Sequence, residues 1–300
     1  MWIAKAPSNI ALIKYMGKHA NNVPWNVSLS YTLEKFVSEV KLDLNSNEDR
    51  FAESTLTDAE KNRFLAHLNY IKKITEFRGY FSVSSQNSYP KSAGIASSAS
   101  SFAALTICAF KAISDIQGKE MPSNEYMSAV SRLGSGSSCR SFFSPWCLWT
   151  KDSAREINIP VAAEHELILI DSSKKKISSS EAHKLVQTSL LLEGRERRAQ
   201  IRCENLIKAF ETDDWQKAYQ ICWDEFWDMH ALFETSNPNF GYILPKTLEY
   251  LIRIRNFWRQ YNDGPIITID AGPNIHLLWR KNENISNLRQ MFNQCMQIVD

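Results

Sequence analysis

Apolar positions recur along the chain with two different spacings. Where apolar and polar residues alternate, the pattern is typical of a half-buried β-strand. Strands are predicted at Trp2–Ala6, around Ser28–Thr32, at Val37–Leu44, around Phe81 and Val83, and at Glu166–Asp171. We expect an asparagine-rich polar loop between the first two strands. Near the C-terminus, IITIDAGPNIHLLW predicts a strand, a tight turn and a second strand.

Other stretches show the spacing of three to four residues that marks an amphipathic helix. Thr57 and Glu60 form a capping-box pattern, and the helix that follows extends to about Phe77. A helix at about Ser123–Leu133 ends at Gly134, a natural position for a left-handed cap. Further helices are predicted after KSAGIASSASS, over roughly Arg195–Phe210, Asp214–Phe233 and Pro245–Tyr261, and from about Asn284. This mixed order favours an α+β fold of two lobes, which we expect at residues 1–160 and 161–300.

Composition narrows the class of protein but not its chemistry. A hydrophobic content of 44% in 300 residues is enough for two lobes that share a core. The formal net charge of +2 gives no general field for nucleic acid. The six scattered cysteines form no CxxC pair, which favours reduced thiols over a disulfide or zinc framework. The chain lacks a signal-peptide pattern and an apolar run of roughly 20 residues, so we expect a cytoplasmic protein without membrane or nucleic-acid partners.

The segment from Pro90 to Ser101 is the first candidate site. Its small residues let the backbone approach a ligand closely, and the free N–H groups of a helix start suit phosphate oxygens. A serine-rich turn before a core helix is the alternative, and the Walker Gly-Lys-Ser/Thr pattern does not follow. The candidate phosphate-binding residues are Ser92, Ala93, Gly94, Ala96, Ser97 and Ser98, of which the last two add hydroxyls that could reach Mg²⁺.

A second Ser/Gly segment, Gly134–Ser141, brings an arginine close to several small residues. The planar guanidinium of Arg140 could hold a carboxylate or a phosphate through two hydrogen bonds. The alternative is a flexible surface loop with a solvated arginine. Two such segments in one chain favour a polyanionic substrate.

Two further groups of polar residues are candidates for chemistry. Asp270 follows an apolar strand and precedes Ala271-Gly272-Pro273, so a partly desolvated carboxylate there could take a proton from a substrate hydroxyl. An ordinary turn aspartate that caps the backbone is the alternative. The N-terminal cluster contains Asn9, Lys14, Tyr15 and Lys18, for which a solvated basic patch is the default interpretation.

The histidines and tryptophans indicate structure more than chemistry. No two histidines have metal-ligand spacing, so His183 and His230 are interpreted as packing or hydrogen-bonding residues. The tryptophans are interpreted as core or interface residues; they are Trp146, Trp149, Trp215, Trp223 and Trp227.

Taken together, four segments resemble the diphosphomevalonate decarboxylases of the GHMP kinase superfamily. They are APSNIALIKYMGK, SAGIASSASSFAAL, GSGSSCRS and DAGPN, in family order and at family spacing across nearly the whole chain. The resemblance implies a GHMP kinase fold with a ribosomal-S5-like N-terminal lobe, a ferredoxin-like C-terminal lobe and an active site in the cleft between them. It also implies that ATP, with Mg²⁺, phosphorylates the 3-hydroxyl of (R)-5-diphosphomevalonate, which then loses phosphate and CO₂ to give isopentenyl diphosphate. A homodimer is the family habit.

The same resemblance implies roles for individual residues. Asp270 corresponds to the family's catalytic aspartate and Arg140 to the arginine that binds the substrate carboxylate. Lys14 and Asn9 match residues near the transferred phosphate and Arg140, and Tyr15 and Lys18 match the pair that binds the diphosphate. The remaining substrate-binding candidates are Ser135, Gly136, Ser137, Ser179, Ser180 and Ala271.

The sequence also departs from the family pattern. Phe142 and Phe143 follow the second Ser/Gly segment where many relatives have a Gly-Gly turn, and Glu181-Ala182-His183 stands where Gly-Met is frequent. A decarboxylase of the 5-monophosphate and a mevalonate 3-kinase therefore remain as alternatives. A catalytically silent sensor of nucleotide or isoprenoid precursors is a third, although such a protein would be expected to lose Asp270 or Arg140.

Overall fold

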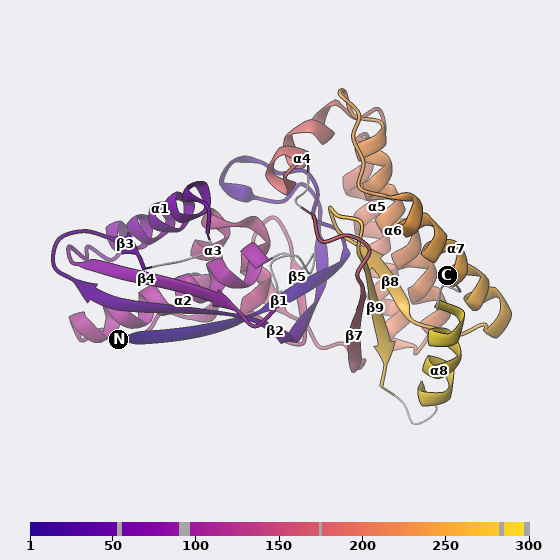
Figure 1. Cartoon of the computed structure of the whole chain (residues 1–300), viewed down its shortest axis with the longest axis horizontal. Helices are drawn as coiled ribbons and strands as arrows, with labels where there is room; N and C mark the ends of the chain where they lie inside the picture. Colours follow the sequence, from indigo (N-terminus) through magenta and orange to yellow (C-terminus); the bar gives the residue numbers. More distant parts are fainter. Residues whose placement is uncertain (53–55, 90–96, 174–175, 282–284, 297–300) are drawn as a thin grey trace.

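Two β-sheets and eight α-helices make up the part of the chain that the structure, a computed structural model, describes: residues 1–52, 56–89, 97–173, 176–281 and 285–296. The larger sheet has the order β3-β4-β2-β5-β6 with β1 paired to β2, and the smaller has the order β7-β9-β8. Helices α1 to α3 lie with the larger sheet at one end of the molecule, and α5 to α8 lie with the smaller sheet at the other (Figure 1). The mixed α+β class predicted from the sequence is confirmed.

The bounds of the strands are β1 Trp2–Ile13, β2 Ser28–Asn45, β3 Arg50–Phe51, β4 Tyr80–Asn87, β5 Trp146–Trp149, β6 Ala154–Glu156, β7 Ala163–Ile168, β8 Ile266–Ile269 and β9 Ile275–Arg280. The α-helices are α1 Asp58–Ile74, α2 Ser97–Gln117, α3 Asn124–Gly134, α4 Ser179–Leu185, α5 Arg195–Glu211, α6 Trp215–Glu234, α7 Pro245–Tyr261 and α8 Ile285–Met296. Short 3-10 helices are η1 Ala20–Asn22, η3 Gly136–Phe142 and η4 Val186–Thr188.

The first two strands are longer than the sequence pattern predicts. The polar loop expected after Ala6 begins later, at residue 14, because β1 continues to Ile13 and all six of its last residues are buried. A strand buried on both faces loses the alternation of apolar and polar residues. The two strands predicted within residues 28–44 are one strand, β2, whose pairing shifts between Pro7↔Val37 and Ser8↔Leu33. Because of this irregularity, the sequence pattern does not show that the two segments form one strand.

Local signals at helix ends are confirmed in one case and wrong in another. Thr57 and Glu60 form the predicted capping box at the start of α1. The left-handed cap predicted at Gly134 is wrong, because this glycine is the last helical residue and the next, Ser135, is extended with φ −150°. Glycine is required there for space, since a Cβ would lie 2.3 Å from Cδ1 of Phe102.

Helix α2 is the central helix of the larger lobe. Its length and hydropathy would suit a membrane span, but 78% of the apolar window is buried inside the molecule. It packs against the larger sheet and against α1 and α3. The first residues of this helix, Ser97 and Ser98, are thereby fixed relative to the sheet.

Strand β7 of the smaller sheet ends at a polar contact. Strand β7 starts three residues earlier than predicted and stops at Ile168. The next N–H groups explain the end, because those of Ile170 and Asp171 donate to Oδ1 of Asn274 instead of continuing the sheet.

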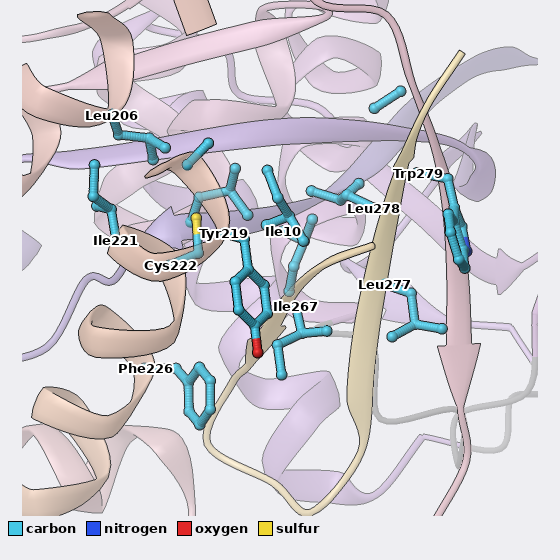
Figure 2. Close-up of a cluster of buried hydrophobic side chains, with 14 of the residues drawn as sticks. Ile10, Leu206, Tyr219, Ile221, Cys222, Phe226, Ile267, Leu277, Leu278 and Trp279 are labelled. Atoms are coloured by element: carbon cyan, nitrogen blue, oxygen red, sulfur yellow. The ribbon is translucent and has the colours of Figure 1, made fainter. Parts of the chain in front are cut away.

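One hydrophobic core joins the two sheets. Ile10 of β1 lies among side chains of α6 and of the smaller sheet, including Cys222 and Ile267 (Figure 2). Burying one such isoleucine contributes roughly 1.5–3 kcal/mol. The predicted structural role of the tryptophans is confirmed, since all five belong to or pack against buried clusters. The shared core holds the end of β1 against the turn after β8, and this is where the candidate site lies.

Candidate active site

A cavity of about 450 Å³ opens where the end of β1, helix η3, the start of α4 and the turn after β8 meet. Most residues that the sequence identified line this one cavity: Lys14, Tyr15, Lys18, Ser98, Ser135, Gly136, Ser137, Arg140, Ser179, Ser180, Asp270 and Ala271. They come from five separate parts of the chain. The fold therefore brings distant segments together. Thr268, next to the turn after β8, donates a hydrogen bond to the carbonyl of Ala11 near the end of β1, 257 residues away.

Lys14 and Asp270 form an ion pair at the floor of the cavity. Lys14 Nζ donates to Asp270 Oδ1 over 2.6 Å, and the Lys14 side chain is 1% exposed whereas that of Asp270 is 27% exposed. Burial alone would raise the pKa of Asp270, but the charges of Lys14, His276 and Arg140 bring it to about 2. Burial lowers the pKa of Lys14, and Asp270 offsets this only in part. The solvated basic patch that the sequence suggested is therefore wrong for Lys14.

The backbone of Lys14 is held by a buried ionic network on α5 and α6. The Lys14 N–H donates to Glu225 Oε1 over 2.9 Å, and the Lys14 carbonyl accepts from Arg195 Nη2 over 3.2 Å. Arg195 and Glu225 are themselves ion-paired and at most 2% exposed. Asp228 is the second carboxylate of this network, and it pairs with Arg195, Arg198 and Arg202. This network fixes the point from which Lys14 reaches Asp270.

Arg140 is buried without a carboxylate partner among the described residues. Its Nε donates to Asn9 Oδ1 over 3.0 Å and its Nη1 to Ser28 Oγ over 2.6 Å. Asn9 in turn donates to Ser141 Oγ over 2.8 Å, so its side chain is held in place. Within the described residues, only neutral groups hydrogen-bond to this guanidinium, and the residue is 5% exposed. A buried cation that has no direct ion pair stabilises an anion that binds beside it.

An aromatic wall closes another side of the cavity. The Tyr15 ring packs against the rings of Trp149 and His183, with centroid distances of 4.5 Å and 4.4 Å. Gly136 lies so close to Tyr15 that a Cβ added to Gly136 would be 2.6 Å from the Tyr15 hydroxyl. Within the described residues that buried hydroxyl has no hydrogen-bond partner.

The rim of the cavity carries further cations. Lys18 Nζ donates to Asn22 Oδ1 over 2.7 Å, and Arg63 Nη2 donates to the Gly134 carbonyl over 3.2 Å. Neither has a carboxylate partner in the part of the chain that the structure describes. Burial lowers the pKa of Lys18, and so do the charges of Arg63 and Lys184. Mutual repulsion of this kind is relieved when a polyanion binds.

A second cavity of about 490 Å³ adjoins the first, and Ser98 and Arg63 line both. Its other walls come from α1, from the end of β4 and from the start of α2, including Ser97, Ser101 and Phe102. Ser135 Oγ lies 3.3 Å from Ser98 Oγ and so links η3 to the helix start. A helix N-terminus attracts phosphate, and this one lies between the two cavities.

The structure separates the sequence candidates into three groups. Most line the first cavity, Ser97 lines only the second, and Asn9 stands behind Arg140 instead of facing either cavity. Ser92, Ala93, Gly94 and Ala96 lie outside the described residues.

The site also contains residues that sequence reasoning missed. Arg63, Asn22 and the Glu225–Arg195 pair had no local pattern, because each acquires its role from a contact with a distant segment. His183 was interpreted only as a packing or hydrogen-bonding residue, yet it lines the first cavity. The replacement of Gly-Met by Glu181-Ala182-His183 was the available signal.

A dedicated metal cage is not part of this site. Among the described residues, no group of three or more histidine, cysteine, aspartate or glutamate side chains could hold a metal ion. The donors near the helix start are hydroxyls, which suit Mg²⁺ that remains bound to phosphate oxygens and water.

A two-sheet α+β fold with a helix start between two adjoining cavities defines a GHMP kinase-type enzyme. The chain belongs to the diphosphomevalonate decarboxylase family. Residues 6–160 match the model of the diphosphomevalonate decarboxylase-like N-terminal domain, and residues 166–300 match that of the mevalonate 5-diphosphate decarboxylase C-terminal domain.

Solved structures and curated proteins agree with this assignment. A crystal structure of a mevalonate diphosphate decarboxylase from Legionella pneumophila is 46% identical, covers 99% of this chain and 98% of that chain, and has a TM-score of 0.94. A mevalonate diphosphate decarboxylase from Enterococcus faecalis is 29% identical, with coverages of 98% and 92% and a TM-score of 0.85. The diphosphomevalonate decarboxylase of Rattus norvegicus is 29% identical over 90% of this chain and 74% of its own length.

Proposed function

We propose that this protein is an ATP-dependent decarboxylase that converts (R)-5-diphosphomevalonate to isopentenyl diphosphate, ADP, phosphate and CO₂. The observation that carries the proposal is the buried Arg140, without a carboxylate partner among the described residues, beside the Lys14–Asp270 pair in a cavity that adjoins a helix start. The family supports it, and so does a related structure described as a complex with MVAPP, AMPPCP and magnesium, which is 29% identical with a TM-score of 0.88.

Phosphorylation of the 3-hydroxyl depends on positioning and charge. The γ-phosphate of ATP lies between the second cavity and the first, near the hydroxyls of Ser97 and Ser98. Mg²⁺ bound with ATP would neutralise phosphate charge, and among the described residues the hydroxyls of Ser97 and Ser98 would help to hold it. Lys14 stabilises the charge on the transferred group, and Asp270 accepts a hydrogen bond from the 3-hydroxyl.

The low pKa of Asp270 favours one of two roles for this residue. A carboxylate with a pKa of about 2 is a weak base, so it orients the hydroxyl more than it removes the proton early. A weak base is sufficient because the transition state of phosphoryl transfer is loose, and the attacking hydroxyl loses its proton late.

Decarboxylation follows from the same arrangement. The bond between C3 and the phosphate oxygen breaks, and the phosphate leaves with that electron pair. The bond from C2 to the carboxylate then breaks, and its electrons form the C2–C3 double bond as CO₂ departs. Arg140 holds the carboxylate in line for this cleavage, while Asp270 stabilises positive charge at C3 electrostatically.

The cations at the rim favour the diphosphate over the monophosphate. Lys18 and Arg63 both lack carboxylate partners within the described chain, and a second phosphate would meet both.

The test is to supply Mg²⁺ and ATP with mevalonate, 5-phosphomevalonate or 5-diphosphomevalonate, and to measure ADP and CO₂. The proposal expects both products and the highest kcat/KM with the diphosphate. A higher value with the monophosphate would make the protein a monophosphate decarboxylase, and ADP without CO₂ would make it a 3-kinase.

Three further properties are also part of the proposal, of which the first two come from the sequence and the third from the habit of the family. They are a division into lobes near residues 160 and 161, a cytoplasmic location and a homodimer. Light scattering of the eluted protein, and separate expression of residues 1–160, would test the assembly and the division.

A further inference from the structure

His183 lines the first cavity and is the family departure that the mechanism above leaves unused. It lies on α4, and the residue is 7% exposed. Its Nδ1 accepts the Gly17 N–H over 3.0 Å. Gly17 has a φ of +86°, and a Cβ added to it would lie 1.9 Å from the ring of Trp25. Only glycine therefore fits at this position. The orientation of the imidazole is therefore set by the backbone.

This contact determines which nitrogen of His183 carries the proton. Burial, together with the charges of Lys18 and then Arg140, lowers the pKa of the imidazole to about 3, so the ring is neutral at physiological pH. A neutral imidazole has one N–H, and Nδ1 is an acceptor here. The proton is therefore on Nε2. In the described part of the chain, no hydrogen bond from Nε2 is present.

Nε2 is not among the buried polar atoms without a partner, so this donor is open to the cavity that His183 lines and can bond to a ligand there. The acceptor comes from the ligand. Gly17, to which the ring is bonded, is the residue next to Lys18, so the ring lies at the part of the cavity that carries this rim cation. The ring also packs against the ring of Tyr15, with a centroid distance of 4.4 Å and an interplanar angle of 47°.

We propose that His183 is a substrate-specificity residue, whose neutral imidazole donates its Nε2–H to a phosphate oxygen on the 5-substituent of the substrate. This inference rests on the proposed function. The Gly-Met sequence that is frequent at this place in the family has no such donor, so this chain holds the phosphate-bearing end with a neutral hydrogen bond in addition to cations.

Two substitutions separate the donor from the acceptor. The side-chain amide nitrogen of glutamine can occupy the position of Nε2, so His183→Gln keeps the donor and loses the acceptor for Gly17. The amide oxygen of asparagine can occupy the position of Nδ1, so His183→Asn keeps the acceptor and loses the donor. Both substitutions remove the ring that packs on Tyr15 and are therefore matched for loss of packing.

The experiment measures Kd for 5-diphosphomevalonate by calorimetry, KM for ATP, kcat, and the melting temperature of both variants. We expect His183→Asn to weaken binding of the diphosphate roughly ten- to a hundredfold, the range for a hydrogen bond to a charged group. The expected changes for His183→Gln are within about threefold. The KM for ATP is unchanged in both, and kcat changes less than Kd because the bond exists before and during the reaction.

Equal effects of the two variants on Kd, whether large or small, would overturn the inference, because packing would then explain them. So would a rise in the KM for ATP that matches the change in Kd. If the wild-type protein turns over none of the three mevalonate compounds, the proposed function is wrong. Turnover by the wild type with no difference between the variants removes only the role of His183.

Discussion

Two serine-rich segments line the substrate cavity, and they differ in how firmly the fold holds them. Gly134–Ser141 is mostly buried, and its hydroxyls bond within the protein: Ser138 Oγ donates to the Ser135 carbonyl over 2.6 Å and Ser141 Oγ accepts from Asn9. Ser178–Ser180 is exposed, and Ser178 accepts from the Glu181 N–H at the start of α4. Similar composition thus produces a rigid wall in one place and a solvated rim in the other.

The difference follows the chemistry that each segment faces. The buried segment carries Arg140 close to Asp270, where a displacement of about 1 Å can cost about 10²-fold in rate. The exposed segment faces the wide opening, where charge matters more than geometry. We infer that the reacting end of the substrate is held by preorganised groups and that the exposed serines of the rim contribute less.

The largest expected effect of a substitution is at the reacting end. Asp270→Asn should lower kcat by roughly 10²–10⁴-fold, because the amide cannot pair with Lys14 or accept the hydroxyl proton. Steady-state release of ADP with 5-diphosphomevalonate measures this. A variant within threefold of the wild type would remove Asp270 from the mechanism.

Arg140→Lys tests the geometry of the rigid wall. A lysine retains the positive charge but cannot make the paired hydrogen bonds of a guanidinium, and it cannot bond Asn9 and Ser28 at once. We expect kcat/KM to fall about 10²-fold with the melting temperature little changed. Full activity in this variant would show that charge alone is sufficient there.

Glu225→Gln tests the network behind Lys14. Removing one charge of a buried ion pair destabilises a protein by about 3–5 kcal/mol, because the partner is left uncompensated. We expect the free energy of unfolding, measured with urea, to fall by that amount. Glu196, which is 62% exposed and pairs with Lys151, provides the control, since Glu196→Gln should cost at most about 1 kcal/mol. Equal losses would show that the buried network does not brace the site.

The smallest effect is expected at the solvated rim. Ser179→Ala and Ser180→Ala should each change kcat/KM by no more than about threefold, because exposed hydroxyls are readily replaced by water. The same assay with Ser137→Ala provides the comparison within the rigid wall. A loss of 10²-fold at either rim serine would contradict the contrast between the two segments.

The sequence predicted most of the elements and the identity of the cavity's main polar residues. Helices such as Arg195–Phe210 and Pro245–Tyr261 followed from spacing, and they agree with α5 and α7 within a residue. The segments at Arg140 and Asp270 were found because each combines a charged residue with small neighbours that let a ligand approach.

What the sequence could not predict depends on distant contacts. Asn9 looked like part of a loop, since nothing in its neighbourhood shows that β1 is buried on both faces there. Lys14 looked solvated, because its partners Glu225 and Asp270 are more than 200 residues away. Gly134 resembled a helix cap, whereas its role is to leave space for Phe102.

The central claim is that one cavity performs both phosphorylation and decarboxylation. The most direct measurement is a single-turnover reaction with limiting 5-diphosphomevalonate, in which ADP, free phosphate, CO₂ and isopentenyl diphosphate are quantified from the same samples. The account predicts one equivalent of each product per substrate, and the loss of all four together in Asp270→Asn. ADP that accumulates without CO₂ in the wild-type protein, or ATP cleavage that does not need the substrate, would contradict it.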